Sequence, residues 1–281
     1  MTPDVPQVPG VQETPHASEV PDASATVPVL SADSVRFSYG KGVDVLRDVS
    51  LALVPGETVG LVGESGAGKT SLLRLLLGLD SPTAGRVLFE GHPLDRRDAR
   101  GMRAFRRAVQ PVYQDPFSSL DPRMRVGDSI AEPLRSLGLP GGRPEQAARV
   151  VELLEAVDLP ADAAERFPDA FSGGQRQRIA IARALAPEPR VILADEPVSA
   201  LDTSVRMQVI ELFQRLSRER GIGMLLVSHD LTIVSALCRR IAVLQDGRLA
   251  EEGETGKVLT DPGHPYTRRL LASVPRLPAA R

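Results

Sequence analysis

The segment 63–70 has residue types and spacing that could bind the phosphates of a nucleotide. It reads Gly-Glu-Ser-Gly-Ala-Gly-Lys-Thr and fits the phosphate-loop pattern G-x-x-x-x-G-K-[ST]. It lies between an apolar stretch, Thr58–Val62, and a leucine-rich stretch, Lys69–Leu79, which predict a strand and a buried helix. Its glycines allow backbone N–H groups to converge on phosphate oxygens at the start of a helix. Lys69 would add a point charge at the β- and γ-phosphates, and the Thr70 hydroxyl could coordinate Mg²⁺.

A second apolar stretch ends in two acidic residues. Val191–Ala194 predicts a buried strand, and Asp195 and Glu196 follow it, so both carboxylates would lie at the carboxyl edge of a parallel sheet. Asp195 would hold the Mg²⁺ shell, and Glu196 would orient or deprotonate the attacking water. Taken alone, such a pair is more typical of a solvated helix start. Downstream of a phosphate loop, it indicates a catalytic pair.

Two further polar residues are expected at the same edge of the sheet. His229 follows the apolar stretch Met224–Ser228, and Gln114 follows a predicted strand, Val109–Tyr113. His229 could donate a hydrogen bond to the γ-phosphate, or it could hold Glu196 and the water in line. Gln114 could sense Mg²⁺ or the water and transmit that state to the segment that follows. An ordinary surface amide is the alternative for Gln114.

A second candidate anion cradle precedes another helix. Phe171–Gln175 supply a serine hydroxyl and two glycine N–H groups at the start of a predicted helix that ends at Leu185. In a chain with two cradles, the second would close over a nucleotide that another copy or a partner holds. On chemistry alone, simple capping of the helix by Ser172 is an equal alternative.

The composition is that of a soluble domain and excludes several classes of protein. Of the 281 residues, 42% are apolar and 25% are charged, and the formal net charge of −2 argues against nucleic-acid binding. A single cysteine, Cys238, excludes an internal disulfide and a cysteine-based zinc cluster. Apolar runs are far shorter than the ~18 residues of a membrane span. Residues 1–29 have neither the basic residues nor the apolar core of a targeting peptide, so we expect a cytoplasmic protein.

The order of predicted elements indicates an α/β fold. Residues 1–29 hold six prolines among small and polar residues and predict a disordered tail. Short β-type segments follow between Val35 and Phe89. A region broken by proline and glycine, about 115–171, predicts a small helical insertion. Helices and apolar strands then alternate over 174–228, which is typical of a parallel sheet covered on both faces.

Together these residues resemble the ATP-binding subunits of ABC transporters over roughly residues 33–270. The resemblance implies a P-loop NTPase of the ABC type, with a RecA-like core, an antiparallel β-subdomain and the α-helical subdomain at about 115–171. This ATPase domain would span 30–262, and 263–281 would form a short C-terminal extension. The resemblance also implies ATP and Mg²⁺ as cofactors.

The resemblance assigns roles residue by residue. Catalysis would involve Lys69, Gln114, Glu196 and His229, and Mg²⁺ would contact Thr70, Gln114 and Asp195. The Walker A loop would comprise Gly63, Glu64, Ser65, Gly66, Ala67, Gly68, Lys69, Thr70 and Ser71. The other nucleotide contacts would be Tyr39 on the adenine, Gln114 in the Q-loop, the signature residues Ser172, Gly173, Gly174 and Gln175, and Asp202 in the D-loop. For Tyr39 the alternative is an ordinary strand or core tyrosine.

Two segments narrow the resemblance to importers of dipeptides, oligopeptides and nickel: Gln114–Arg123 and His264–Thr267. Asp195–Asp202 resembles the second of two ATPase subunits in such systems, whereas the proline-rich tail departs from the family. The subfamily implies an ATPase that powers an importer of short peptides, with nickel or another small solute as the alternative. Its partners would be a second ABC ATPase subunit in a homo- or heterodimer, two integral-membrane permeases and, indirectly, an extracytoplasmic solute-binding protein. The ATPase subunit itself would be a peripheral protein on the cytoplasmic face of the membrane.

Two other classes of protein share the phosphate loop. An ABC-type ATPase that works on nucleic acid or ribosomes would need a long coiled coil or a second nucleotide domain, and 281 residues accommodate neither. A soluble P-loop kinase would have no reason for the cradle at Ser172–Gln175 or for His229. We therefore expect a transporter ATPase with no nucleic-acid partner.

Overall fold

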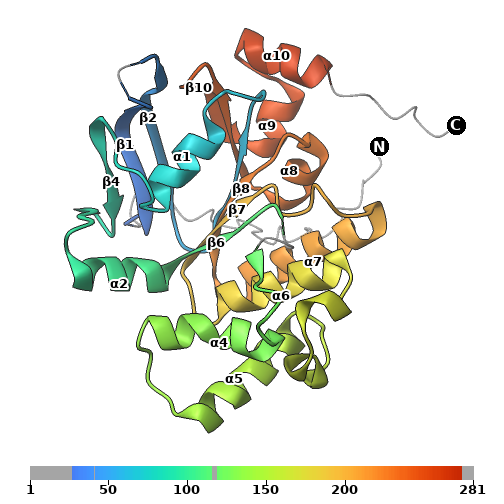
Figure 1. Cartoon of the computed structure of the whole chain (residues 1–281). Coiled ribbons are helices and arrows are strands. Elements are labelled where there is room, and N and C mark those ends of the chain that lie inside the picture. The colour runs from blue at the N-terminus through green and yellow to red at the C-terminus, as the bar shows by residue number, and fades with distance from the viewer. Residues whose placement is uncertain (1–26, 41, 116–118, 274–281) are drawn as a thin grey trace, which may run out of the picture.

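The computed structural model describes residues 27–40, 42–115 and 119–273. The expected disorder of 1–26, part of the importer-like segment at 116–118 and the end of the C-terminal extension lie outside these ranges. Two sheets stand side by side in Figure 1, one of six strands and one of four. The larger runs in the order β10-β9-β3-β8-β7-β6, and only the pair β9 and β10 is antiparallel. Its strands are β3 (Thr58–Val62), β6 (Val109–Val112), β7 (Val191–Asp195), β8 (Gly223–Val227), β9 (Arg240–Gln245) and β10 (Arg248–Glu254).

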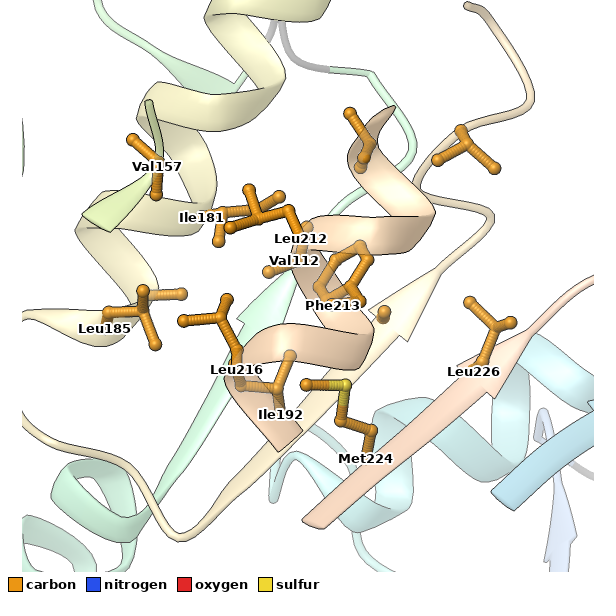
Figure 2. Close-up of a cluster of buried hydrophobic side chains, with 14 of the residues drawn as sticks. Val112, Val157, Ile181, Leu185, Ile192, Leu212, Phe213, Leu216, Met224 and Leu226 are labelled. Carbon is orange, nitrogen blue, oxygen red and sulfur yellow. The ribbon is translucent and has the colours of Figure 1, made fainter. Parts of the chain in front are cut away.

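Both faces of the six-stranded sheet are covered, because successive residues of its central strands belong to different hydrophobic clusters. Ile192 packs with Phe213 of α7 (Thr203–Arg220) in the cluster drawn in Figure 2. The next residue, Leu193, belongs to the cluster that contains α1 (Lys69–Leu76). All five residues of β3 and of β8 are buried, as in a parallel strand between two layers of helices. The fold class predicted from the sequence, α/β with a parallel core sheet, is confirmed.

The four-stranded sheet is antiparallel and runs in the order β2-β1-β4-β5. The start of this sheet corrects the expected boundary of the N-terminal tail, which we placed at residue 29. Val29 is fully buried and its N–H donates to the carbonyl oxygen of Leu53 at 2.9 Å, so the packed domain includes residue 29. An apolar residue next to a strand gains more from burial than it loses in backbone entropy. The strands are β1 (Leu30–Ser38), β2 (Asp44–Leu53), β4 (Ala84–Phe89) and β5 (His92–Pro93).

In its described residues, the segment that we interpreted as a helical insertion includes the α-helices α4 and α5, which pack on a third. Helices α4 and α5 lie at the lower end of the molecule in Figure 1 and contact α6, which carries the predicted second cradle at its start. Asp158, after α5, ties this region to the core by ion pairs with Arg178 of α6 and Arg215 of α7. The elements are α4 (Val126–Ser136), α5 (Arg143–Ala156), the 3₁₀ turns η1 (Ala161–Glu165) and η2 (Pro168–Ala170), and α6 (Gly173–Leu185).

The remaining helices include one that was not predicted from the sequence. Helix α2 (Ala99–Ala108) is rich in arginine but buries Met102 and Phe105. Helix α1 ends at Leu76, and Leu79, which we had expected inside a buried helix, is 44% exposed in the turn that follows. None of the helices in the described ranges combines the length and the hydropathy that spanning a bilayer requires. The other helices are α8 (Leu231–Leu237), α9 (Thr255–Thr260) and α10 (Pro265–Ala272).

Candidate nucleotide-binding site

The phosphate loop connects β3 to α1, as its sequence context predicts. Gly63 follows β3 with φ +154°, and a Cβ atom there would lie 2.2 Å from the carbonyl oxygen of Leu244 on β9, so only glycine fits. The loop ends at Lys69, the first residue of α1. Its ammonium Nζ donates to the carbonyl oxygens of Gly63 at 2.7 Å and Glu64 at 2.9 Å. The loop therefore closes around the Lys69 ammonium. The backbone N–H groups at the N-terminus of α1 lie at the end of this loop, where Thr70 is exposed.

Tyr39 lies beside the phosphate loop. Its hydroxyl is 3.2 Å from Oγ of Ser71 on α1, and the edge of its ring packs against Phe37 with the centroids 4.8 Å apart. The residue is nevertheless 59% exposed, so it is not a core tyrosine. An exposed aromatic ring next to a phosphate loop is suited to stacking on a base.

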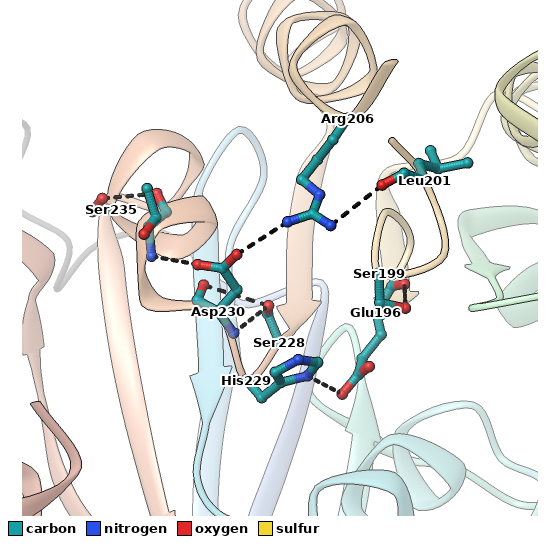
Figure 3. Close-up of polar contacts among 9 residues, drawn as sticks. Glu196, Ser199, Leu201, Arg206, Ser228, His229, Asp230 and Ser235 are labelled. Carbon is teal, nitrogen blue, oxygen red and sulfur yellow. Dashed lines mark hydrogen bonds and ion pairs between the residues drawn. The ribbon is translucent and has the colours of Figure 1, made fainter. Parts of the chain in front are cut away.

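Three predicted side chains meet at the carboxyl edge of the six-stranded sheet. Gln114 follows β6, Glu196 follows β7 and His229 comes two residues after the end of β8. The imidazole Nδ1 of His229 lies 2.9 Å from Oε1 of Glu196 (Figure 3), and Nε2 of Gln114 lies 3.4 Å from Oε2 of the same carboxylate. Glu196 has φ +43°, and its N–H donates to the carbonyl oxygen of Val227 at 2.9 Å. The backbone thus turns sharply after β7 and aims the carboxylate between the two neighbouring strand ends.

The charges of the loop and the acidic pair influence one another. Burial raises the pKa of Asp195, and the negative charge of Glu196 raises it further, while Lys69 lowers it. Burial lowers the pKa of Lys69, against the opposing effect of Glu196 and Asp195. Each charge is therefore incompletely neutralised by its neighbours, as expected where a polyphosphate and its cation bind.

The donor set at this edge fits Mg²⁺ better than a transition metal. A carboxylate at Asp195 and an exposed hydroxyl at Thr70 are hard oxygen ligands, and the amide oxygen of Gln114 is of the same kind. Among the described residues, no three histidine, cysteine or acidic side chains cluster as a metal site. A few oxygen ligands are enough for Mg²⁺, which keeps several waters and takes the rest of its shell from phosphates.

The predicted second cradle forms a cap at the start of α6. The Ser172 hydroxyl accepts from the Gln175 N–H at 3.4 Å, and the Gln175 Oε1 accepts from the Ser172 N–H at 3.0 Å. The capping alternative is thus present in the structure. Within the part of the chain that the structure describes, these residues form no hydrogen bond to the phosphate loop. Ser172 is exposed, Gly173 is half-buried and Gly174 packs against Val205 of α7.

Arg206 connects two loops at the site and was missed in the sequence. Its guanidinium donates to the carbonyl oxygen of Leu201 at 3.3 Å and to Oδ2 of Asp230 at 3.4 Å (Figure 3). Asp202, the predicted D-loop contact, is the exposed residue that precedes α7. The Ser199 hydroxyl donates to the Glu196 carbonyl oxygen at 3.0 Å. Since arginine is common throughout the chain, nothing in the local sequence distinguishes Arg206.

The comparisons with known proteins agree with this arrangement. Residues 46–199 match the family model described as "ABC transporter". The glutathione import ATP-binding protein GsiA from Escherichia coli O6:H1 is 47% identical over 277 residues, which cover 94% of this chain and 44% of GsiA. GsiA from Escherichia coli K12 is 50% identical over 233 residues, which cover 83% of this chain and 37% of that protein. The chain thus spans less than half the length of these relatives.

Solved structures with the same fold are also ATP-binding cassettes. CbiO1 from Clostridium perfringens, part of the ABC transporter complex cbiONQ, has a TM-score of 0.75 and 26% identity, with 83% of this chain and 91% of that chain covered. The cassette MJ0796, solved as a dimer in a post-hydrolysis state with ADP and Pi, has a TM-score of 0.71 and 31% identity, with 80% and 98% covered. The family expected from the sequence is confirmed: the chain belongs to the ABC transporter family and carries that family's ATPase domain.

Proposed function

We propose that this chain binds and hydrolyses ATP to power a membrane importer of short peptides, with nickel or another small solute as the alternative cargo. The observation that carries the proposal is the meeting of Gln114, Glu196 and His229 at one sheet edge, beside a closed phosphate loop. The similarity to GsiA, named as a glutathione import protein, supports a peptide-like cargo because glutathione is a tripeptide.

In this proposal each polar group has a separate task in hydrolysis. Lys69 and the N–H groups at the start of α1 bind the β- and γ-phosphates. Glu196 accepts a proton from the attacking water, and His229 and Gln114 hold the carboxylate in place from both sides. Mg²⁺ held by Thr70, Asp195 and Gln114 would neutralise charge that develops on the phosphate oxygens. Tyr39 stacks on the adenine.

We further propose that the working unit is a dimer of cassettes. Ser172, Gln175 and Asp202 are exposed and Gly173 is half-buried, whereas Gly174 is buried against α7. The exposed residues lie apart from the hydrogen-bonded network of the phosphate loop, so they suit contact with a nucleotide on a second subunit. The dimeric form of MJ0796 supports this arrangement. Of a homodimer and a heterodimer with a related ATPase, we favour the heterodimer.

Closure of this dimer would move the helical segment at about 115–171 against two integral-membrane permeases, at the cytoplasmic face of the membrane. An extracytoplasmic solute-binding protein would deliver the cargo to those permeases. Arg183 of α6 donates to the carbonyl oxygen of Ser119 at 2.6 Å, which gives the segment after Gln114 a direct connection to the signature helix.

Uptake by living cells tests the proposal. The gene is deleted in its source organism and complemented with the wild-type chain or with Glu196→Gln, and uptake of labelled glutathione, dipeptides and nickel is measured. We expect deletion to abolish uptake of at least one of these cargoes, the wild type to restore it and the variant to fail. Unchanged uptake of all of them after deletion would contradict an importer of this class, and ribosomal RNA or DNA bound to the purified chain would favour the nucleic-acid class.

A further inference from the structure

The turn that begins α10 is held in place by several polar contacts. Glu251 on β10 accepts from the N–H groups of Gly263 at 2.7 Å and His264 at 3.0 Å. Burial raises the pKa of Glu251, but hydrogen bonds, including these two, outweigh burial and hold the pKa below its usual value. His264 caps the helix, because its Nδ1 accepts from the Tyr266 N–H at 3.2 Å, and Pro265 occupies the first turn. These contacts fix the direction in which Tyr266 leaves the helix.

Tyr266 reaches the phosphate loop from this turn. The residue is 4% exposed, and its hydroxyl accepts a hydrogen bond of 3.0 Å from the backbone N–H of Glu64, the second residue of the loop. The preceding residue, Gly63, lies directly against the carbonyl oxygen of Leu244, and Lys69 holds the carbonyl groups of the same two residues. The first two residues of the loop thus lie against β9 and are hydrogen-bonded to Lys69 and to Tyr266 of α10.

We propose that Tyr266 is a positioning residue for nucleotide binding: its hydroxyl holds the entry of the phosphate loop in the conformation that receives the phosphates. The inference rests on the proposed ATP site and adds to it a residue that lies 202 positions further along the chain than its partner Glu64. A loop ordered before the ligand arrives loses less conformational entropy on binding, so the ligand binds more tightly. The hydroxyl contributes through the loop and makes no contact with the nucleotide itself.

The substitution Tyr266→Phe tests this role because it removes one oxygen atom and keeps the ring. Ser273→Ala is the matched control: it removes a hydroxyl at the other end of α10, where Oγ donates to the Leu270 carbonyl oxygen at 2.7 Å. Binding of the non-hydrolysable analogue AMP-PNP with Mg²⁺ is measured by calorimetry. Amide exchange of the segment 59–66 is followed by mass spectrometry without nucleotide, and steady-state ATPase kinetics and thermal unfolding are measured on the same samples.

For Tyr266→Phe we expect the Kd for AMP-PNP and the KM for ATP to rise about threefold to tenfold, with kcat within about twofold, as expected for one lost hydrogen bond. Exchange in 59–66 should speed up by a similar factor, and Ser273→Ala should match the wild type in every measurement. A Kd within about 1.5-fold of wild type, or unchanged exchange in 59–66, would overturn the role of Tyr266.

Failure of the wild type to bind AMP-PNP would instead contradict the proposed ATP site, and loop exchange alone would then decide the role of the tyrosine. Should Tyr266→Phe unfold, Glu251→Ala is the second variant. It keeps the hydroxyl but removes the acceptor that seats the turn, and we expect a smaller increase in Kd and in loop exchange. No increase in either would overturn the proposal.

Discussion

Nδ1 of His229 lies 2.9 Å from Oε1 of Glu196, and this contact joins the ends of two neighbouring parallel strands. Gln114 approaches the other carboxylate oxygen at 3.4 Å from the end of a third strand. The Glu196 side chain is 20% exposed, so its orientation depends on these two neighbours more than on water. Of the two roles considered for His229, the geometry favours holding Glu196 in line.

Replacement of Glu196 by Gln should separate ATP binding from hydrolysis. The amide keeps the shape of the side chain but cannot accept the proton of the attacking water, so we expect kcat to fall by about 10²-fold or more. The Kd for ATP should stay within about threefold of wild type, because the phosphate loop is unchanged. Calorimetry and a coupled ATPase assay measure the two quantities. Unchanged turnover with intact binding would rule out Glu196 as the base.

Replacement of His229 by Ala should lower kcat with little effect on KM. The variant removes the group that orients Glu196, and loss of one oriented polar group at a reacting centre typically costs about 10²-fold in kcat. Ser235→Ala is a suitable control, since Ser235 lies on the next helix and its hydroxyl donates to the Thr232 carbonyl oxygen at 2.8 Å. A rise in KM with unchanged kcat would instead place His229 in ground-state ATP binding.

Replacement of Lys69 by arginine should impair ATP hydrolysis, although the substitution keeps the positive charge. Lys69 Nζ fits between the carbonyl oxygens of Gly63 and Glu64 at 2.7 and 2.9 Å, where a compact ammonium fits and a planar guanidinium does not. We expect Lys69→Arg to lose at least about 10²-fold in kcat/KM for ATP. Lys257→Arg is the matched control, because Lys257 is exposed on α9, and it should behave as the wild type. Near-normal turnover of Lys69→Arg would contradict the proposed role.

Local patterns in the sequence predicted four strands of the six-stranded sheet, β3, β6, β7 and β8, but not β9 or β10. Gln114, Glu196 and His229 each follow one of the predicted strands, so their meeting at one edge could be predicted as well. Helix α2 was not predicted, because arginines surround its apolar residues in the sequence. Met102, Phe105 and Ala108 nevertheless repeat at helical spacing, and all three are buried. The roles of Tyr266 and Arg206 could not be predicted in this way. Their partners, Glu64 and Asp230, are distant in sequence, and only the packing of α10 and α7 brings them together.

Gly174 in α6 should not tolerate a methyl group. A Cβ atom there would lie 2.1 Å from Cγ1 of Val205 on α7, so the Val205 side chain or the helix that carries it would have to move. We expect Gly174→Ala to lower the free energy of unfolding by about 1–3 kcal/mol. Gly256→Ala on α9 is the matched control, since no atom lies within 4 Å of its Cβ position, and it should be neutral or slightly stabilising. Urea unfolding measures the free energy of unfolding of both variants. If Gly174→Ala were as stable as the control, Val205 and α7 would accommodate the added methyl group without loss of stability.

Asp158 should make the attachment of α5 to the core sensitive to acid. Burial raises the pKa of Asp158, but hydrogen bonds from Arg178 and Arg215 outweigh it and hold the pKa below its usual value of 3.8. The folded state therefore binds this proton less readily than the unfolded state. The stabilisation is present above pH 3.8 and is lost as the pH falls through the folded-state pKa.

We expect Asp158→Asn to lower the free energy of unfolding at about pH 7 by about 1 kcal/mol, a small value because the carboxylate is half-exposed and screened by water. Asn tolerates the left-handed backbone at this position, where φ is +57°, so the substitution removes charge without straining the turn. Urea unfolding should give a difference from wild type that shrinks below pH 3.8. Glu152→Gln is the control, because Glu152 is an exposed carboxylate paired with Arg149, and it should change little at any pH. A difference that stays constant in acid would mean that Asp158 stabilises the fold by its shape, since its charge would then contribute nothing.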